Sequence, residues 1–238
     1  VMTSIQTSDT SRAQLPWLRI TVVMAVACVL PFFLSNYHVF QASMVLSTAI
    51  ALVGLNILTG YSGQISLGHG AFLAIGAYTT AILMDKFDVP YWATIPVAGL
   101  VCLVAGFLFG LPALKLEGHY LALATFALAV ALPQLLKFRY LEPWTGGVQG
   151  IVIMKPDPPI SSFIGLTLNS DRWLYFVALL VAALMYLVAW NLLRGRIGRA
   201  LIAIRDQPTA AALMGIDTSL YKSLAFGVSA LFTGVAGS

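Results

Sequence analysis

The sequence predicts an all-α fold, a bundle of helices that crosses a membrane several times. Of the 238 residues, 59% are hydrophobic and only 9% are charged, and the mean hydropathy is +0.89. Soluble domains carry roughly 25% charged residues. The apolar residues also gather in stretches of about 20, the length that an α-helix needs to span a bilayer. We therefore expect a polytopic integral membrane protein embedded in lipid.

The apolar stretches predict about seven spanning helices behind a polar N-terminal tail. No stretch has an acidic residue at its centre. We assign residues 1–16 to the tail and residues 17–238 to the transmembrane domain. The last helix is expected to be truncated, because its apolar run reaches the end of the sequence without flanking charges. The expected helices cover residues 17–34, 39–59, 65–84, 91–114, 119–138, 173–193 and 219–238.

Basic residues predict the orientation, because cytoplasmic loops carry an excess of Lys and Arg. The loop at 194–218 holds four arginines and is placed inside, which makes the N-terminus cytoplasmic and the long loop at 139–172 external. The basic residues then inside are Arg12, Arg19, Lys115, Arg194, Arg196, Arg199, Arg205 and Lys222, and those outside are Lys86, Lys137, Arg139, Lys155 and Arg172.

The loop at 194–218 is more than a tether, since its pattern predicts two short helices. Ile197, Leu201 and Ile204 are spaced to form one apolar stripe on the first helix. In the second, Asp206 is expected as the N-cap, Pro208 in the first turn and Gly215 just past the end. That helix would present residues 210–214 at the membrane surface, a shape suited to docking another protein. The docking surface is assigned to Arg205, Asp206, Ala210, Ala211, Leu213, Met214 and Gly215.

Residues 60–72, GYSGQISLGHGAF, carry four glycines between two apolar runs. Glycine inside a helix costs about 1 kcal/mol relative to Ala, so the cluster predicts a broken or re-entrant helix. Irregular backbone at membrane depth must lie inside protein or beside water, and interrupted helices often build transport paths. Alternatively, the glycines simply let helices pack closely. The residues concerned are Asn56, Gly60, Gly63, Gln64, Ser66, Gly68, His69 and Gly70.

Two further features favour packing over chemistry. His69 has no acidic neighbour in the sequence, so we expect a structural hydrogen bond rather than a proton relay. Gly106 and Gly110 form a GxxxG pattern, which favours close contact between helices.

The loop at 139–172 contains the segment EPWTGGVQGI at 142–151. Its glycines are expected to make tight turns. At this length the loop has room for structure of its own. It would receive a partner protein, close the outer mouth of a path, or be merely a long connection. The residues singled out are Thr145, Gly146, Gly147 and Gly150.

Several function classes lack their sequence patterns here. The chain has no GxxxxGK[ST], HExxH or GxSxG motif and no pair of carboxylates within its spans. Its basic residues are scattered rather than grouped for nucleic acid. We expect neither an enzyme nor a metal or cofactor site. An active transporter of this kind takes energy from another subunit or an ion gradient. A stand-alone channel is the alternative, and it would conduct without ATP.

Three segments carry a resemblance to a known family: GLNILTGYSGQISLGHGAFLAIGAY at 54–78, TGGVQGI at 145–151 and GRALIAIRDQPTAAALMGIDTSLYKSLAF at 198–226. They resemble the inner-membrane permeases of bacterial ABC importers for branched-chain amino acids, in the same order over nearly the whole chain. The likeness is closest to the LivM-type half of the permease pair. Urea and short-chain-amide importers share nearly the same motifs, so those substrates remain an alternative.

The resemblance implies partners and a mechanism. The partners are a second permease of LivH type, two cytoplasmic ATPases that bind ATP and Mg, and a periplasmic binding protein. The segment at 206–217 then matches the coupling region, whose AA…G pattern is present as Ala210, Ala211 and Gly215, while Thr209 replaces the usual leading Glu. The implied mechanism is that this segment moves as a rigid lever when the ATPases close on ATP.

Overall fold

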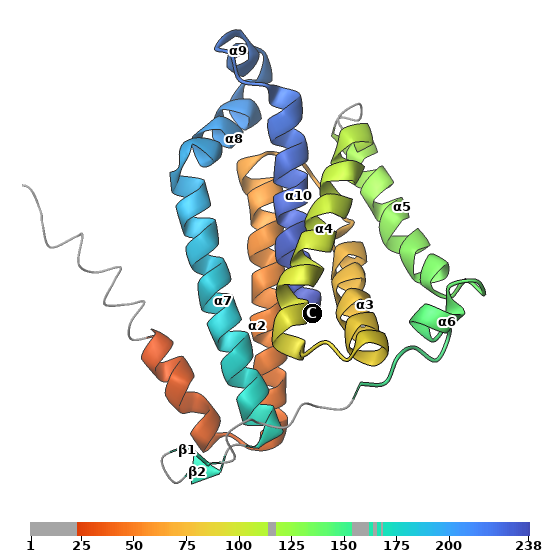
Figure 1. Ribbon diagram of the computed structural model, residues 1–238. Coiled ribbons are helices and arrows are strands. Elements are labelled where there is room, and N and C mark those ends of the chain that lie inside the picture. The colour runs from red at the N-terminus through yellow and green to blue at the C-terminus, as the bar shows by residue number, and fades with distance from the viewer. Residues whose placement is uncertain (1–22, 114–117, 154–161, 164–165, 168) are drawn as a thin grey trace, which may run out of the picture.

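The computed structural model describes residues 23–113, 118–153, 162–163, 166–167 and 169–238, and most of them are helical (Figure 1). A short helix at Val23–Phe33 comes first. It is followed by α2 (Asn36–Asn56), the π-helix η1 (Ile57–Tyr61), α3 (His69–Phe87), α4 (Tyr91–Ala113), α5 (His119–Leu136), α6 (Glu142–Thr145), the strands β1 (Ser162–Phe163) and β2 (Leu166–Thr167), α7 (Ser170–Arg194), α8 (Arg196–Asp206), α9 (Pro208–Leu213) and α10 (Thr218–Gly237).

Within the described part of the chain, five helices are long and apolar enough to cross a membrane. They are α2 continued by η1, α4, α5, α7 and α10. This confirms the polytopic helical bundle. The predicted span at 65–84 is wrong in its bounds, since α3 begins only at His69, after the break, and runs to Phe87. Of the predicted span at 17–34, residues 17–22 lie outside the described residues, as does the whole tail at 1–16.

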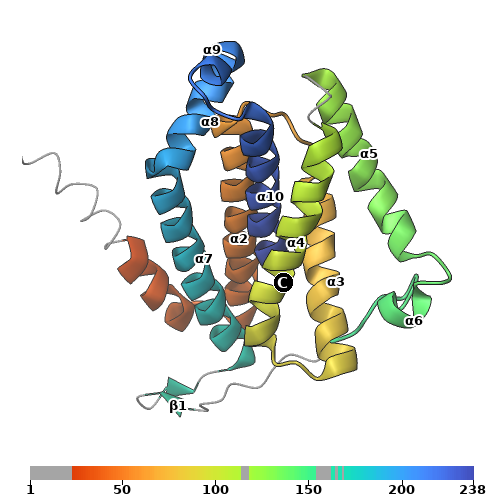
Figure 2. The same cartoon turned by 45° about the horizontal axis from the view of Figure 1, so that its top comes forward.

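The helix at the centre of the bundle is the last one, α10. It lies between α2, α3 and α4 in both views (Figures 1 and 2), and ten of its residues are buried. Small residues allow this close packing, because they let helix backbones approach one another. A Cβ added to Gly106 of α4 would overlap the Cβ of Ala230, and one added to Gly110 would lie 3.1 Å from the Cα of Ser223. The close contact predicted for the GxxxG pattern is therefore confirmed.

One cluster of large side chains joins α10 to its neighbours near the end where α8 lies. The ring of Phe226 lies 6.2 Å from the ring of Phe72 on α3 and 5.8 Å from that of Phe109 on α4. Leu58 of η1 and Leu201 of α8 are fully buried in the same cluster. The break in the α2–α3 region and the short helix α8 are thus anchored on one apolar core.

The two long loops of the chain lie at opposite ends of the bundle. The helices α8 and α9 project at one end, whereas α6 and the antiparallel hairpin of β1 and β2 lie at the other (Figure 1). Such an arrangement is required if the loops are on opposite sides of a membrane. Which end faces the cytoplasm stays a prediction.

Candidate functional site

The first part of the site is the sharp turn from α7 into the amphipathic helix α8. A Cβ on Gly198 would overlap the carbonyl of Leu193, so the turn needs glycine there. Leu201 and Ile204 are buried on one face of α8, and Ile197 packs against the same cluster. This is the predicted apolar stripe. Away from that face, α8 carries the exposed Arg196 and Arg199, so the helix packs on the bundle by one side.

The junction between α8 and α9 differs from the prediction. The N-cap of α9 is Gln207, whose backbone is extended, and its side chain makes no capping hydrogen bond. Asp206 is the last residue of α8, and its carboxylate accepts a 2.9 Å hydrogen bond from Nε of Arg205. The prediction of Asp206 as the N-cap is therefore wrong. The reason is Pro208, which disfavours helical backbone at the residue before it and so moves the junction to Gln207.

The end of α9 follows the prediction. Gly215 has a φ of +83°, which glycine adopts without strain. Its N–H donates to the carbonyl of Ala212 at 3.0 Å, and the N–H of Ile216 donates to that of Ala211 at 3.1 Å. This pair of bonds is a Schellman motif. Gly215 is confirmed as the residue that ends the helix.

An exposed apolar tip results. The side chains of Leu213 and Met214 are 89% and 85% exposed, at the far end of the molecule from the strands (Figure 1). Ala210 is exposed as well. Ala211 is buried, so its expected presentation is wrong: it lies on the inner side of α9. We refer to Leu213 and Met214 as the α9 tip.

The second part of the site is the broken helix. The last turn of α2 widens into η1, residues 62–68 form a turn and an irregular segment, and α3 then begins at His69. The predicted interruption is present. Burial alternates through this segment: Ser62, Gln64, Ser66 and Gly68 are buried, whereas the residues between them are exposed. Its polar side chains thus face the interior of the bundle.

The inward-facing polar groups hold the irregular backbone. The side chain of Gln64 donates to Oγ of Ser62 at 2.7 Å and to the carbonyl of Lys222 at 3.2 Å. Oγ of Ser66 accepts from the N–H of Gly68 at 3.3 Å, and Oγ1 of Thr125 accepts from that of Leu67 at 3.0 Å. Backbone groups that leave a helix inside a membrane need such partners.

His69 bonds to the central helix. Its Nε2 lies 2.7 Å from Oγ of Ser229, and this hydroxyl donates to the carbonyl of Gly54 at 2.7 Å. The hydroxyl therefore accepts a hydrogen bond from Nε2 of His69. The arrangement is the structural hydrogen bond expected for a lone histidine, and it joins α2, α3 and α10.

The glycines of the break have different surroundings. Gly63 has a φ of +72°, and a Cβ on Gly68 would lie 2.9 Å from the carbonyl of Thr125, so both positions need glycine. A Cβ on Gly60 would overlap the amide oxygen of Asn56, whereas nothing lies within 4 Å of such an atom on Gly70. A role of these residues in lining a path stays a prediction.

The third predicted segment forms a compact turn at the other end of the bundle. Oγ1 of the buried Thr145 donates a 2.7 Å hydrogen bond to the carbonyl of Leu136. The same oxygen accepts a 3.3 Å hydrogen bond from the backbone N–H of Gly147. Gly146, Gly147 and Gly150 all have positive φ, as tight turns require. The segment is structured, and its function stays a prediction.

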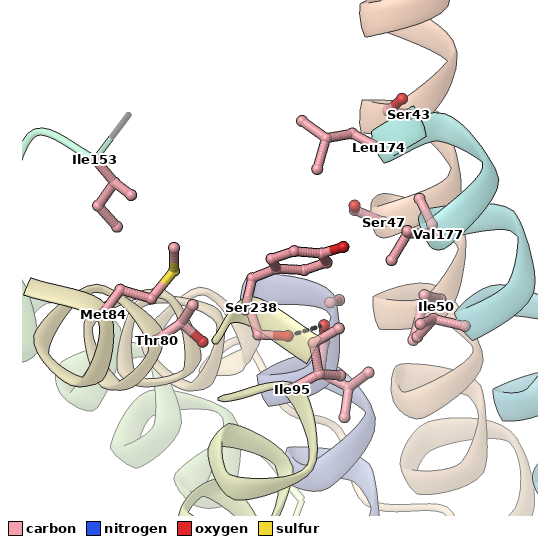
Figure 3. A pocket seen from close by; sticks show the side chains of 15 residues that line it. Ser43, Ser47, Ile50, Thr80, Met84, Ile95, Ile153, Leu174, Val177 and Ser238 are labelled. Carbon is pink, nitrogen blue, oxygen red and sulfur yellow. Dashed lines mark hydrogen bonds between the residues drawn. The ribbon is translucent and has the colours of Figure 1, made fainter. Parts of the chain in front are cut away.

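Sequence reasoning missed a cavity of about 360 Å³ near this end (Figure 3). Its polar lining comes from Ser43 and Ser47 of α2, Thr80 of α3, Tyr91 of α4 and Ser238 after α10, and the remaining lining residues are apolar. None of its lining residues is charged, and none belongs to the broken segment. The four-residue spacing of Ser43 and Ser47, which places them on one helix face, was the available sequence indication. In the part of the chain that the structure describes, no three His, Cys, Asp or Glu side chains gather as metal ligands.

These features define a class, a polytopic membrane protein with a broken helix and a projecting short helix. Residues 38–238 match the family described as branched-chain amino acid transport system / permease component, and the chain belongs to that family. It is similar to the high-affinity branched-chain amino acid transport system permease protein LivM of Salmonella typhimurium and of Escherichia coli, with 37% identity over 93% of this chain. The alignment covers 56% of each relative, so the chain spans about half of their length.

The likeness extends to more distant relatives. A probable branched-chain amino acid transport permease protein LivM of Methanocaldococcus jannaschii is 24% identical over 79% of this chain. A probable LivH permease protein of the same organism is 24% identical over 86% of it. No solved structure gives a significant match.

Proposed function

We propose that this chain is a permease subunit of an ABC importer that carries leucine, isoleucine and valine across the inner membrane of a bacterium. The observation that carries the proposal is the 37% identity, over 93% of the chain, to permeases named for high-affinity branched-chain amino acid transport. The proposed partners are a LivH-type permease, a periplasmic binding protein and two cytoplasmic ATPases, which hold ATP and Mg. This subunit itself does no chemistry and needs no cofactor.

The geometry supports the coupling role of α8 and α9. A six-residue helix is not stable alone in water, yet α9 is held by its Schellman motif and by the buried Ala211. Its tip exposes two large apolar side chains, and the helix before it carries the arginines that favour a cytoplasmic position. A rigid, apolar projection at that end suits a groove on an ATPase.

The cavity supports a small substrate with an apolar part. Its hydroxyl groups offer hydrogen bonds, and its aliphatic side chains suit an apolar group of the substrate. Because none of its lining residues is charged, a small amide such as urea fits the same lining, and urea transport is the second candidate.

The test uses the complete complex, with its second permease, ATPases and binding protein, in liposomes. ATP-dependent uptake of labelled leucine is measured in competition with valine and with urea. We expect valine to suppress leucine uptake and urea to leave it unchanged. Uptake of urea without uptake of leucine would contradict the amino-acid substrate, and uptake without ATP would indicate a stand-alone channel.

A further inference from the structure

One side chain connects the projecting end of the molecule directly to the broken helix. Nη1 of Arg205, on α8, donates a 2.8 Å hydrogen bond to the carbonyl of Gly60, on η1. Gly60 lies in the last turn of its helix, where carbonyl groups have no partner farther along the helix. A cation at this position also interacts favourably with the helix dipole. Arg205 therefore caps a helix that lies 145 positions away in the sequence.

The arginine is held along its whole length. A Cβ added to Gly63 would lie 2.8 Å from Cγ of Arg205, so the aliphatic part of the side chain lies across this glycine. On its other edge, the guanidinium makes an ion pair with Asp206, with 2.9 Å between Nη2 and Oδ1. Although 43% of the side chain is exposed, the guanidinium has a hydrogen-bond acceptor on each of two edges, the carbonyl of Gly60 and the carboxylate of Asp206. Charge-assisted hydrogen bonds of this kind are stronger and more directional than neutral ones.

The position of Arg205 makes this contact important for movement. It lies beside the extended junction at Gln207 and three residues before the start of α9. Leu201 of α8 lies in the same apolar cluster as Ile57 and Leu58 of η1, and apolar contacts are not directional. Among the described residues, the hydrogen bond from Arg205 to Gly60 is the directional contact between α8 and η1.

We infer that Arg205 is the positioning residue that transmits movement of α9 to the broken helix. The inference rests on the proposed function and adds the route by which the ATPase acts on the spanning helices. When α9 moves with its ATPase, α8 carries Arg205 with it, and the end of η1 follows through the carbonyl of Gly60. The small residue Gly63 leaves room for the arginine to lie against this backbone.

The test compares three variants in the complete complex in liposomes. Arg205→Met keeps the aliphatic stem but removes the donor, Arg205→Lys keeps a positive donor, and Arg196→Met removes an exposed positive charge from the same helix as the matched control. Leucine transported per ATP hydrolysed is measured together with the yield and thermal stability of the complex. We expect Arg205→Met to lower this ratio about tenfold, within the range of allosteric couplings, with unchanged yield and stability. Arg205→Lys should restore most of the ratio, and Arg196→Met should leave it unchanged.

A second readout does not depend on the substrate. Spin labels are attached at Ala212→Cys on α9 and Ile65→Cys in the broken segment, in a background in which the exposed Cys28 is replaced by Ser. In the otherwise unchanged protein, we expect the label at Ile65 to move with the label at Ala212, so that their distance stays constant on ATP binding. With Arg205→Met, the distance should change, because α9 then moves alone.

The outcomes separate the two proposals. The inference would be overturned if Arg205→Met leaves the ratio of leucine transported to ATP hydrolysed unchanged, or if it lowers yield, ATPase activity and uptake in parallel. Neither result would contradict the proposed transporter function. The wild-type complex could fail to take up leucine while the distance between the labels still depends on Arg205. That result would overturn leucine as the substrate and support the inference. If the distance between the labels responds to ATP in the same way with Arg205 and with Arg205→Met, the inference is contradicted, whatever the substrate is.

Discussion

At the scale of single residues, the structure places its buried polar side chains at positions where helices meet. Ser229 is the clearest case: its hydroxyl accepts from His69 and donates to the carbonyl of Gly54, so three helices share one side chain. It is almost completely buried. A buried polar group that loses its partner costs about 1–3 kcal/mol, so this position should be sensitive to substitution.

Ser229→Ala is therefore expected to lower the free energy of unfolding by about 1–3 kcal/mol, because it leaves Nε2 of His69 without its hydrogen-bond partner. The measurement is thermal unfolding of the purified protein in lipid nanodiscs. Thr48→Ala is the control, since the hydroxyl of the exposed Thr48 donates to the carbonyl of Met44 in its own helix and its loss should have little effect. Equal stability of the two variants would show that the His69–Ser229 bond contributes nothing.

At the scale of elements, α10 and α4 depend on glycine for their contact. The pattern GxxxG predicted that Gly106 and Gly110 face another helix, and they do. The pattern does not name the partner helix, because spacing on one helix carries no information about which distant segment supplies the other surface.

Gly106→Ala is expected to destabilise the bundle by about 1–3 kcal/mol, because the new methyl group meets Ala230 and the helices must separate. Gly70→Ala adds the same atom where nothing lies within 4 Å, and should be neutral or slightly stabilising. Both are measured by thermal unfolding in the same lipid. A larger loss for Gly70→Ala than for Gly106→Ala would contradict the packing described here.

Local patterns predicted the break and the short helices but not their details. Glycine clustering predicted an interrupted helix, and Gly215 was correctly read as a helix end. The π-helix at Ile57–Tyr61 has no local sequence rule behind it. The N-cap of α9 was misplaced by one residue, because the effect of Pro208 on the residue before it outweighed the capping preference of Asp206.

At the scale of the whole molecule, the fold class followed from composition, whereas the arrangement of the helices did not. Apolar runs of the right length predicted most of the spanning helices, since a bilayer demands that length. The central place of α10 and the bond from Arg205 to Gly60 arise between segments far apart in the chain. The cavity was missed for the same reason, because its lining comes from five helices and the loop that holds Ile153.

The two ends of the bundle also carry different features. The end with α8 and α9 presents the α9 tip and Arg205, and the opposite end holds the turn at Thr145 and the cavity. In the proposed importer, the first end receives the ATPase and the second faces the binding protein. The contact of the α9 tip with an ATPase is the central claim.

Site-directed cross-linking in the assembled complex tests this claim most directly. A cysteine is placed at Met214 or, as the matched control, at Val152, which is 91% exposed near the opposite end. The exposed Cys28 is first replaced by Ser. Each cysteine is labelled with a short reagent that carries a thiol-reactive group and a photoreactive group, and the complex is then illuminated. We expect an adduct between Met214→Cys and an ATPase subunit, and none between Val152→Cys and the ATPase. An ATPase adduct from Val152→Cys with none from Met214→Cys would contradict it.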